Sequence, residues 1–298
     1  MKPIPLGRPA IGREEINNVT KVLKSGWLTH GDFNLELEGL IKKYFRVKEC
    51  VLVNSCASAL LASLIALELP AGSEVVVPSF TFVASANAIV LAGLKPVFAE
   101  IDLSTGNLDV NLLGKYVTKK TTAIMPVHFA GQPVDMTSVI KIAKKYKLKV
   151  VEDSAECIGG KWGDKFAGTF GDLGCFSFWA TKNITTGEGG AIITDNLRLV
   201  QRLRAIIAHG VPSSTLDREH QLKPWLREAI LPGFNFRLSN LAAAVGVAQF
   251  KKINQLNQKR SRLAGRLTQR LRPLASVIPL LPVKEAGHVY QMYPVRLV

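Results

Sequence analysis

The sequence has no run that approaches the roughly 20 unbroken apolar residues of a membrane-spanning helix. Its first residues, MKPIPLGRPAIGREE, also lack the apolar core of a signal peptide. We therefore expect a cytoplasmic protein that has no membrane partner.

Cysteine is scarce, and the few cysteines lie far apart in the chain. No two of them form a CxxC pair, and none is spaced from a histidine as zinc ligands are. Each follows or lies within an apolar run typical of a strand, which predicts buried, reduced thiols and no metal site. The four residues are Cys50, Cys56, Cys157 and Cys175.

Two common nucleotide-binding motifs are missing as well. A P-loop places its glycines before the lysine, whereas the glycines of GEGG follow Lys182 here. The dinucleotide fingerprint GxGxxG does not occur. These absences exclude a P-loop nucleotide triphosphatase and leave a dinucleotide-binding fold without support.

The composition is that of an ordinary globular protein, with 47% hydrophobic and 20% charged residues in a chain of 298. From residue 50 to about 195, short runs of Val, Ile, Leu and Ala alternate with helical stretches. This pattern predicts an α/β fold with a mostly parallel sheet sandwiched by helices. Ligands of such sheets bind beyond the carboxyl ends of the strands, so we expect functional residues just after each strand.

Positive charge is abundant, with a net charge of +15. Eight Lys or Arg and no acidic residue lie between Lys251 and Arg272, where apolar residues recur at helical steps. This predicts an amphipathic helix whose basic outer face is solvated or meets an anionic partner, nucleic acid or a nucleotide-diphosphate substrate. Nucleic acid is not favoured, because no helix-turn-helix, zinc-finger or aromatic RNA-binding motif occurs. The expected inner face consists of Ile253, Leu256, Leu263, Leu267 and Leu271.

Four features that follow predicted strands match the needs of one cofactor. Lys182, in FSFWATKNITTGEGG, can bond to an aldehyde, and Asp153, at the end of KVVED, can keep a pyridine nitrogen protonated. The small residues of NSCASAL open a helix whose N–H groups favour an anion, and Phe82 offers an apolar plate for a flat ring. A metal at Asp153 is not expected, because alternation points Glu152 to the other face of the strand. Taken singly, these residues also suit a surface lysine, a capping aspartate and a core phenylalanine; together they fit pyridoxal 5′-phosphate.

The chain resembles the DegT/DnrJ/EryC1/StrS family of sugar aminotransferases, which are pyridoxal phosphate enzymes of fold type I. The resemblance covers essentially the whole chain and is most specific in the blocks VVEDSAECIGG and FSFWATKNITTGEGG. It implies a large cofactor-binding domain with an N-terminal arm over residues 1–240. It further implies the start of a small α+β domain over residues 241–298. The family usually continues further, so we expect part of the small domain to be missing.

The resemblance also implies roles for residues around the cofactor ring. Lys182 is implied as the Schiff-base lysine and proton carrier, and Asp153 as the partner of the pyridine nitrogen. Phe82 is implied as the side chain that stacks on the ring. Glu156 stands where many relatives have Gln, near the phenolic oxygen, where a carboxylate repels the phenolate unless it is protonated or turned away.

The cofactor's phosphate is implied to bind at a second group of residues. The backbone of Ala57 and Ser58 and the hydroxyl of Ser177 supply its donors. Asn235 reaches the phosphate in the site of the other subunit, which makes the expected protein a homodimer with shared active sites.

The implied reaction moves an amino group from an amino acid, expected to be glutamate, to a nucleotide-linked keto sugar. Such a reaction serves the biosynthesis of amino sugars and surface polysaccharides. Dehydratase relatives replace the lysine with His, so Lys182 favours transfer over dehydration. The alternatives are a dehydratase or aromatic amino acid synthase of the same family, or a regulatory or nucleic-acid-binding protein on the same fold.

Overall fold

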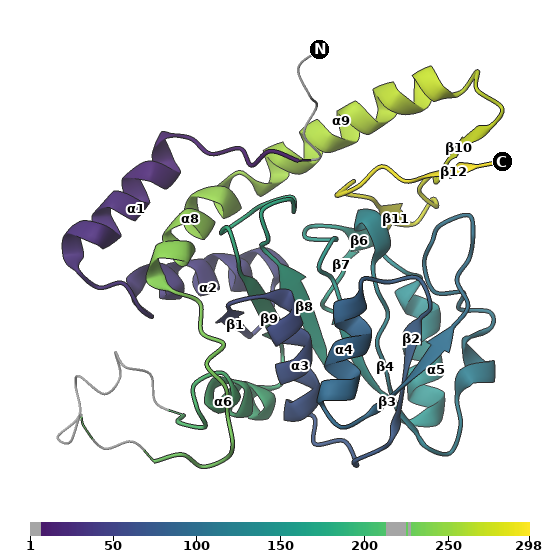
Figure 1. Cartoon of the computed structure of the whole chain (residues 1–298). Coiled ribbons are helices and arrows are strands. Elements are labelled where there is room, and N and C mark those ends of the chain that lie inside the picture. Colours follow the sequence, from purple (N-terminus) through teal and green to yellow (C-terminus); the bar gives the residue numbers. More distant parts are fainter. Residues whose placement is uncertain (1–6, 213–224, 226–227) are drawn as a thin grey trace. The chain divides into compact units, whose positions relative to one another are not determined.

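The computed structural model describes residues 7–212, 225 and 228–298 (Figure 1). These residues form two compact units. The first unit comprises Met1–Leu67 and Ser177–Ile253, and the second comprises Glu68–Phe176 and Asn254–Val298. The predicted division at residue 240 into a large and a small domain stays a prediction.

The first unit combines a two-stranded pair with helices. Strands β1 (Glu49–Val53) and β9 (Gly190–Thr194) are antiparallel and almost entirely buried. Helices α1 (Arg13–Ser25) and α2 (Asp32–Phe45) pack on α8 (Asn240–Lys251), as Figure 1 shows. The remaining helices of this unit are α3 (Cys56–Ala66) and α6 (Leu197–Ile206).

The second unit carries the predicted parallel strands. They are β2 (Glu74–Pro78), β3 (Lys95–Ala99), β4 (Thr121–Ile124), β5 (Lys149–Asp153) and β8 (Leu173–Ser177), whose last residue lies at the unit boundary. Their order is β8-β5-β4-β2-β3, and every neighbouring pair is parallel. The prediction of a mostly parallel sheet is confirmed, because apolar runs without alternation suit strands covered on both faces.

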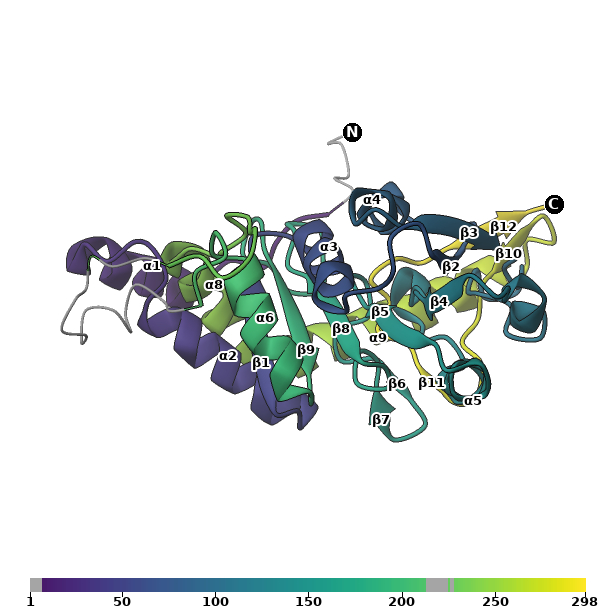
Figure 2. The ribbon, with the colours of Figure 1, turned by 90° about the horizontal axis from the view of Figure 1, so that it is seen from below.

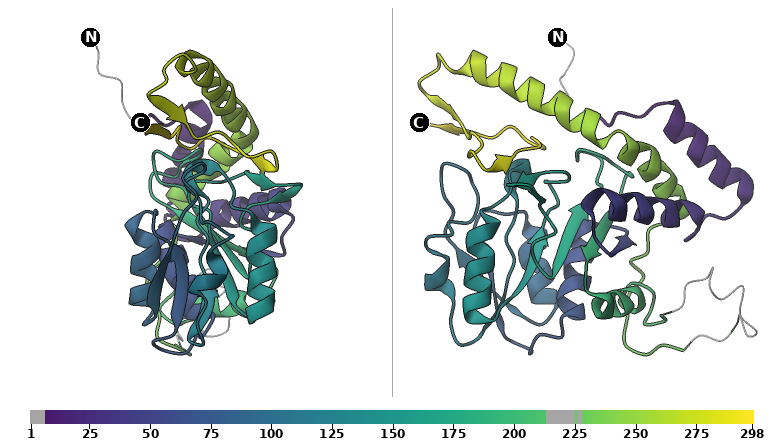
Figure 3. Two further views of the ribbon diagram at one scale, coloured as in Figure 1. Left: turned by 90° about the vertical axis from the view of Figure 1, so that its right-hand side faces the viewer. Right: turned by 180° about the vertical axis from the view of Figure 1, so that it is seen from behind.

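Helices cover both faces of these parallel strands. Figures 2 and 3 show α4 (Val83–Leu91) on one face and α5 (Met136–Tyr146) on the other. The short 3-10 helices η1 (Leu113–Tyr116) and η2 (Phe129–Gly131) lie in the connections. The core beneath α5 is formed by buried aliphatic side chains, which include Val76, Ile124, Met136, Val139 and Val150.

The basic segment forms α9 (Ile253–Leu271), so the predicted helix is confirmed. Its predicted inner face is correct only in part, because Ile253 is buried whereas Leu263 and Leu267 are 54% and 40% exposed. The side of α9 that contacts other parts of the second unit is instead largely polar. Arg260 donates to the backbone oxygens of residues 290 and 291 at 3.1 and 3.0 Å, while Ala264 is buried. Hydrogen bonds to backbone carbonyls therefore determine which face of α9 is turned inward, and a sequence pattern does not reveal such acceptors.

The last part of the chain forms three short strands. Strands β10 (Val277–Pro279) and β12 (Val295–Leu297) pair antiparallel with each other. Strand β11 (Ala286–Gly287) joins β6 (Lys161–Trp162), which in turn pairs with β7 (Lys165–Phe166). Each of these three strands is only two or three residues long. Among all described residues, no helix combines the length and the apolarity needed to cross a bilayer.

Candidate active site

Asp153 ends β5 and is 5% exposed. Its Oδ2 accepts a hydrogen bond from Ser85 Oγ at 2.7 Å, and its Oδ1 accepts one from the Ala155 N–H at 3.1 Å. Its backbone is held by the segment that follows β4, since the His128 N–H donates to the Asp153 carbonyl at 3.0 Å. A donor on each oxygen fixes the plane of the carboxylate.

Glu152, one residue earlier, is fully buried and has different partners. Its Oε1 accepts the N–H groups of Phe170 and Gly171 at 2.6 Å each. Its Oε2 accepts the Gly168 N–H at 2.7 Å and lies 3.0 Å from Nε2 of the equally buried His128. The predicted alternation is confirmed, because the two carboxylates contact separate sets of residues. Glu152 ties a loop to β5 and has no chemistry to offer a ligand.

The tautomer of His128 follows from its second ring nitrogen. Nδ1 accepts a hydrogen bond from the Val134 N–H at 3.1 Å, so Nδ1 carries no proton. The proton of the neutral ring is therefore on Nε2 and is donated to Glu152. This pair fixes the segment that follows β4 to the end of β5.

Phe82 is the residue immediately before α4 and is 77% exposed. A large aromatic side chain that is this exposed beside the carboxyl end of a buried strand leaves much apolar surface in water. Phe80, two residues earlier, packs instead on Phe129 with ring centroids 4.9 Å apart. Phe82 is thus available to cover a flat ligand, as the sequence predicts.

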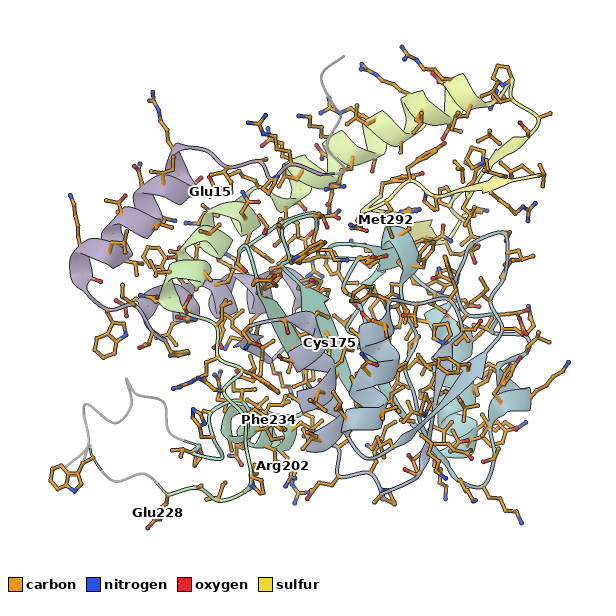
Figure 4. The ribbon with its side chains drawn as sticks, viewed as in Figure 1. Glu15, Cys175, Arg202, Glu228, Phe234 and Met292 are labelled. Atoms are coloured by element: carbon orange, nitrogen blue, oxygen red, sulfur yellow. The ribbon has the colours of Figure 1, made fainter. Side chains whose placement is uncertain are left out.

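Glu156 is held by a strained loop. Its Oε2 accepts the N–H of Ala130 at 2.8 Å, and Ala130 is buried with φ of 55° and ψ of 6°. A residue with a β-carbon rarely adopts this left-handed conformation, and such strain concentrates at functional sites. The Ala130 carbonyl in turn accepts the N–H of Met292, which is labelled in Figure 4. One oxygen of Glu156 is therefore turned to the backbone.

In the first unit, α3 begins with a serine cap. Ser55 is extended, with φ of −164°, and its Oγ accepts the N–H of Ser58 at 3.1 Å. The two hydroxyls are 3.0 Å apart. Ala57 is exposed in the first turn. This helix start is typical of an anion site. An anion that bound the Ser58 N–H would take the place of the Ser55 hydroxyl as its acceptor.

Lys182 lies on a tight loop between β8 and β9, and the loop is pinned at Phe178. The Phe178 carbonyl accepts the Thr185 hydroxyl at 3.0 Å and the Thr186 N–H at 2.9 Å. The Lys182 N–H donates to the carbonyl of Trp179 at 2.9 Å. The hydroxyls around the lysine therefore hold the loop, rather than only surrounding it as polar neighbours.

The glycines after Lys182 serve close packing. Gly187 has φ of 84°, a conformation that favours glycine. A β-carbon on Gly189 would lie 2.2 Å from Thr186 Oγ1 and 3.1 Å from Leu238. Ser177, at the start of the loop, is 7% exposed, and its Oγ accepts the N–H of Trp179 at 3.3 Å.

Asn235 is exposed, and the residues before and after it in the chain are phenylalanines whose rings stack on each other. Phe234, labelled in Figure 4, and Phe236 have centroids 4.6 Å apart and planes within 7° of each other. Asn235 Oδ1 accepts the Nε and Nη2 groups of Arg237 at 3.3 Å each. The amide thus stands at the surface of the first unit, oriented by Arg237.

The predicted site residues come from both units. Asp153, Glu156 and Phe82 all lie in the second unit. That all the predicted residues bind one cofactor stays a prediction. The residues of the first unit are Ala57, Ser58, Ser177, Lys182 and Asn235.

Sequence reasoning missed two contacts around Asp153. The first is Ser85, which lies in a helix where a serine usually serves its own first turn. The second is the Glu152–His128 pair. One signal for this pair is present in the sequence, since both residues lie near the ends of neighbouring predicted strands. In the part of the chain that the structure describes, no three His, Cys, Asp or Glu side chains gather as a metal ion would require.

The model of the DegT/DnrJ/EryC1/StrS aminotransferase family matches residues 9–298. This chain belongs to that family. The predicted family and the predicted enzyme class, an aminotransferase, are confirmed. Spore coat polysaccharide biosynthesis protein SpsC of Bacillus subtilis, a relative, is 35% identical over 294 residues, which are 99% of this chain and 76% of SpsC.

Solved structures of related enzymes share the fold. Helicobacter pylori PseC, an aminotransferase of pseudoaminic acid biosynthesis, superposes with a TM-score of 0.93 at 31% identity, over 100% of this chain and 78% of PseC. The E. coli GDP-4-keto-6-deoxy-D-mannose-3-dehydratase with bound hydrated PLP superposes with a TM-score of 0.91 at 26% identity, over 100% of this chain and 79% of that enzyme. The fold-type I prediction is confirmed.

Proposed function

We propose that this aminotransferase moves the amino group of glutamate to the ketone of a nucleotide-linked sugar, in amino-sugar or surface-polysaccharide biosynthesis. The names of SpsC and PseC support a sugar acceptor, since both relatives serve polysaccharide or amino-sugar biosynthesis. The observation that carries the proposal is the buried Asp153 carboxylate with a donor on each oxygen. Such a group suits a protonated ring nitrogen and needs no metal.

The cofactor is pyridoxal 5′-phosphate, and residues of this chain fit it. Asp153 would hold the ring nitrogen, and Phe82 would cover one face of the ring. Ala57 and Ser58, in the first turn of α3, and the Ser177 hydroxyl would hold the phosphate. When bound, the cofactor supplies a carbonyl carbon that accepts the amino group and a ring that draws electrons from the donor's alpha carbon.

The residues of the chain divide the remaining work. Lys182 would bond to the cofactor at rest. When it is not bonded to the cofactor, its amine would carry the proton from the donor's alpha carbon to the cofactor carbon that takes up the amino group. Asp153 would pair with the ring nitrogen and so keep that nitrogen protonated. Glu156 would lie near the phenolic oxygen, with the oxygen that accepts the Ala130 N–H turned to the backbone.

We further propose a homodimer in which Asn235 completes the phosphate site of the other subunit. Asn235 is exposed and oriented by Arg237, which suits a contact in trans. Exposed apolar side chains on α4 and β3 offer surface that a second copy can bury. They are Val83, Val90, Leu91 and Phe98.

A cytoplasmic location is proposed, and the four buried cysteines support it.

A spectroscopic titration tests the reaction. The protein is loaded with pyridoxal phosphate, its visible spectrum is recorded, and glutamate is added. We expect the visible band of the lysine-bound cofactor to disappear as the amine form accumulates. Product analysis with nucleotide-linked keto sugars then separates transfer, which yields an amino sugar, from dehydration, which yields a deoxy keto sugar. A stable band that glutamate leaves unchanged would contradict the proposal.

Mixed dimers test the shared site. Lys182→Ala and Asn235→Ala subunits are each impaired alone, and the two are unfolded and refolded together. If Asn235 acts in trans, one site of each mixed dimer regains both native residues, and activity returns. If Asn235 acts within its own subunit, every site of the mixture keeps one substitution and activity stays low.

A further inference from the structure

Ser85 is a fully buried serine in the first turn of α4. Its Oγ lies 2.7 Å from Asp153 Oδ2 and 2.8 Å from Thr81 Oγ1. Its own N–H already donates to the Phe82 carbonyl at 3.1 Å, so the helix start does not need the hydroxyl. The side chain therefore serves a contact outside its helix.

The direction of these hydrogen bonds follows from the number of protons. An ionised carboxylate only accepts, so the single hydroxyl proton of Ser85 goes to Asp153. The Thr81 hydroxyl must then donate to Ser85 Oγ. Its other contact, with the Phe82 carbonyl, is longer at 3.4 Å. Two hydroxyls thus form a chain that ends on Asp153, and each bond polarises the next.

A second serine–aspartate pair in the same unit shows how this one differs. Ser138 Oγ also donates to an aspartate at 2.7 Å, but its partner Asp135 is three residues away and caps the start of α5. The partner of Ser85 is 68 residues away, and Phe82 at the start of α4 makes no side-chain cap. The Ser138 pair closes its own helix, whereas the Ser85 pair joins α4 to the end of β5.

Building on the proposed function, we propose that Ser85 is a positioning residue for the reaction. Its hydroxyl, which accepts a hydrogen bond from Thr81, holds the Asp153 carboxylate in the orientation that meets the ring nitrogen of the cofactor. Phe82 lies between Thr81 and Ser85 in the chain. One short segment therefore supplies both the plate for the ring and the donors that orient the carboxylate.

The test compares Ser85→Ala with the wild-type holoenzyme. Loss of a hydrogen bond to a charged group should slow the glutamate half-reaction roughly 10- to 100-fold and weaken pyridoxal phosphate binding severalfold. The same measurements are repeated with the 1-deaza analogue, which has C–H in place of the ring nitrogen. With that analogue Asp153 has no ring N–H to meet, so wild type and Ser85→Ala should bind it equally and react at equal rates.

Matched variants separate positioning from folding. Ser138→Ala removes a bond of equal length and should leave cofactor affinity and rate unchanged. Thr81→Val should give a smaller loss than Ser85→Ala, and Thr81→Ser should restore the rate. If Ser85→Ala does not fold, as judged by circular dichroism, the Thr81 pair carries the test.

Two results would overturn the inference. One is equal pyridoxal phosphate affinity and rate in Ser85→Ala and wild type. The other is an equal loss with the deaza analogue, which would assign Ser85 a structural role only. A wild-type protein that binds no pyridoxal phosphate would instead overturn the proposed function, and the inference with it.

Discussion

The two faces of β5 carry adjacent carboxylates that differ in their partners. Glu152 accepts three backbone N–H groups and the His128 imidazole, so its oxygens bind a loop and a neighbouring segment. Asp153 accepts one backbone N–H and one serine hydroxyl, and it lies at the end of the strand. The same chemical group is a structural anchor on one face, and on the other it is the group that we propose to hold the cofactor's ring nitrogen. The number and kind of donors distinguish them.

The largest effect is expected from Asp153→Asn. An amide cannot hold a ring nitrogen protonated, so the glutamate half-reaction should slow about a thousandfold, as for loss of a proton-handling group. The amide can still accept the Ser85 hydroxyl, so the melting temperature should stay within a few degrees. Stopped-flow spectroscopy and thermal unfolding measure the two. A collapse of stability with little change in rate would reverse the roles assigned to the two faces.

The opposite pattern is expected for Glu152→Gln. Each Glu152 oxygen accepts two hydrogen bonds, and an amide nitrogen cannot accept any, so buried donors are left without partners. The free energy of unfolding should fall by about 3 kcal/mol. Lys149→Met is the matched control at the start of β5, because it removes an exposed ion pair with Asp172 at 3.0 Å and should cost under about 1 kcal/mol. Equal losses in urea unfolding of the two variants would contradict this reading.

A smaller effect, on pH dependence, concerns the second histidine of the unit. Burial lowers the pKa of His288 from 6.5 to about 4, and its Nδ1 accepts the Tyr290 N–H at 2.9 Å. Between these pH values His288 is protonated in the unfolded chain and neutral in the folded chain. The contribution of His288 to the free energy of unfolding is therefore fully present above pH 6.5. It is lost as the pH drops toward 4, by up to about 3 kcal/mol.

The difference in unfolding free energy between wild type and His288→Gln isolates this term from other titrating groups. The wild type should lose more stability than the variant between pH 6.5 and 4. Parallel pH profiles for the two proteins would show that His288 titrates alike in the folded and unfolded states.

Sequence patterns predicted the parallel strands for a physical reason, whereas the site residues that follow these strands stay predictions. A strand buried on both faces must be apolar throughout, and a reactive group must follow it, so Asp153 and Lys182 stand out in the chain. The inner face of α9 was not predictable in this way, because Arg260 turns inward to backbone carbonyls that sequence does not reveal. Ser85 was missed for a similar reason, since its partner is remote in the chain.

The central claim is that one lysine, Lys182, binds the cofactor covalently. The most direct measurement is reduction of the pyridoxal phosphate-loaded protein with borohydride, followed by peptide mapping by mass spectrometry. We expect the cofactor's mass on the peptide that contains Lys182, at about one per chain, and none in Lys182→Ala. Full labelling at a different lysine, or unchanged labelling of Lys182→Ala, would contradict it.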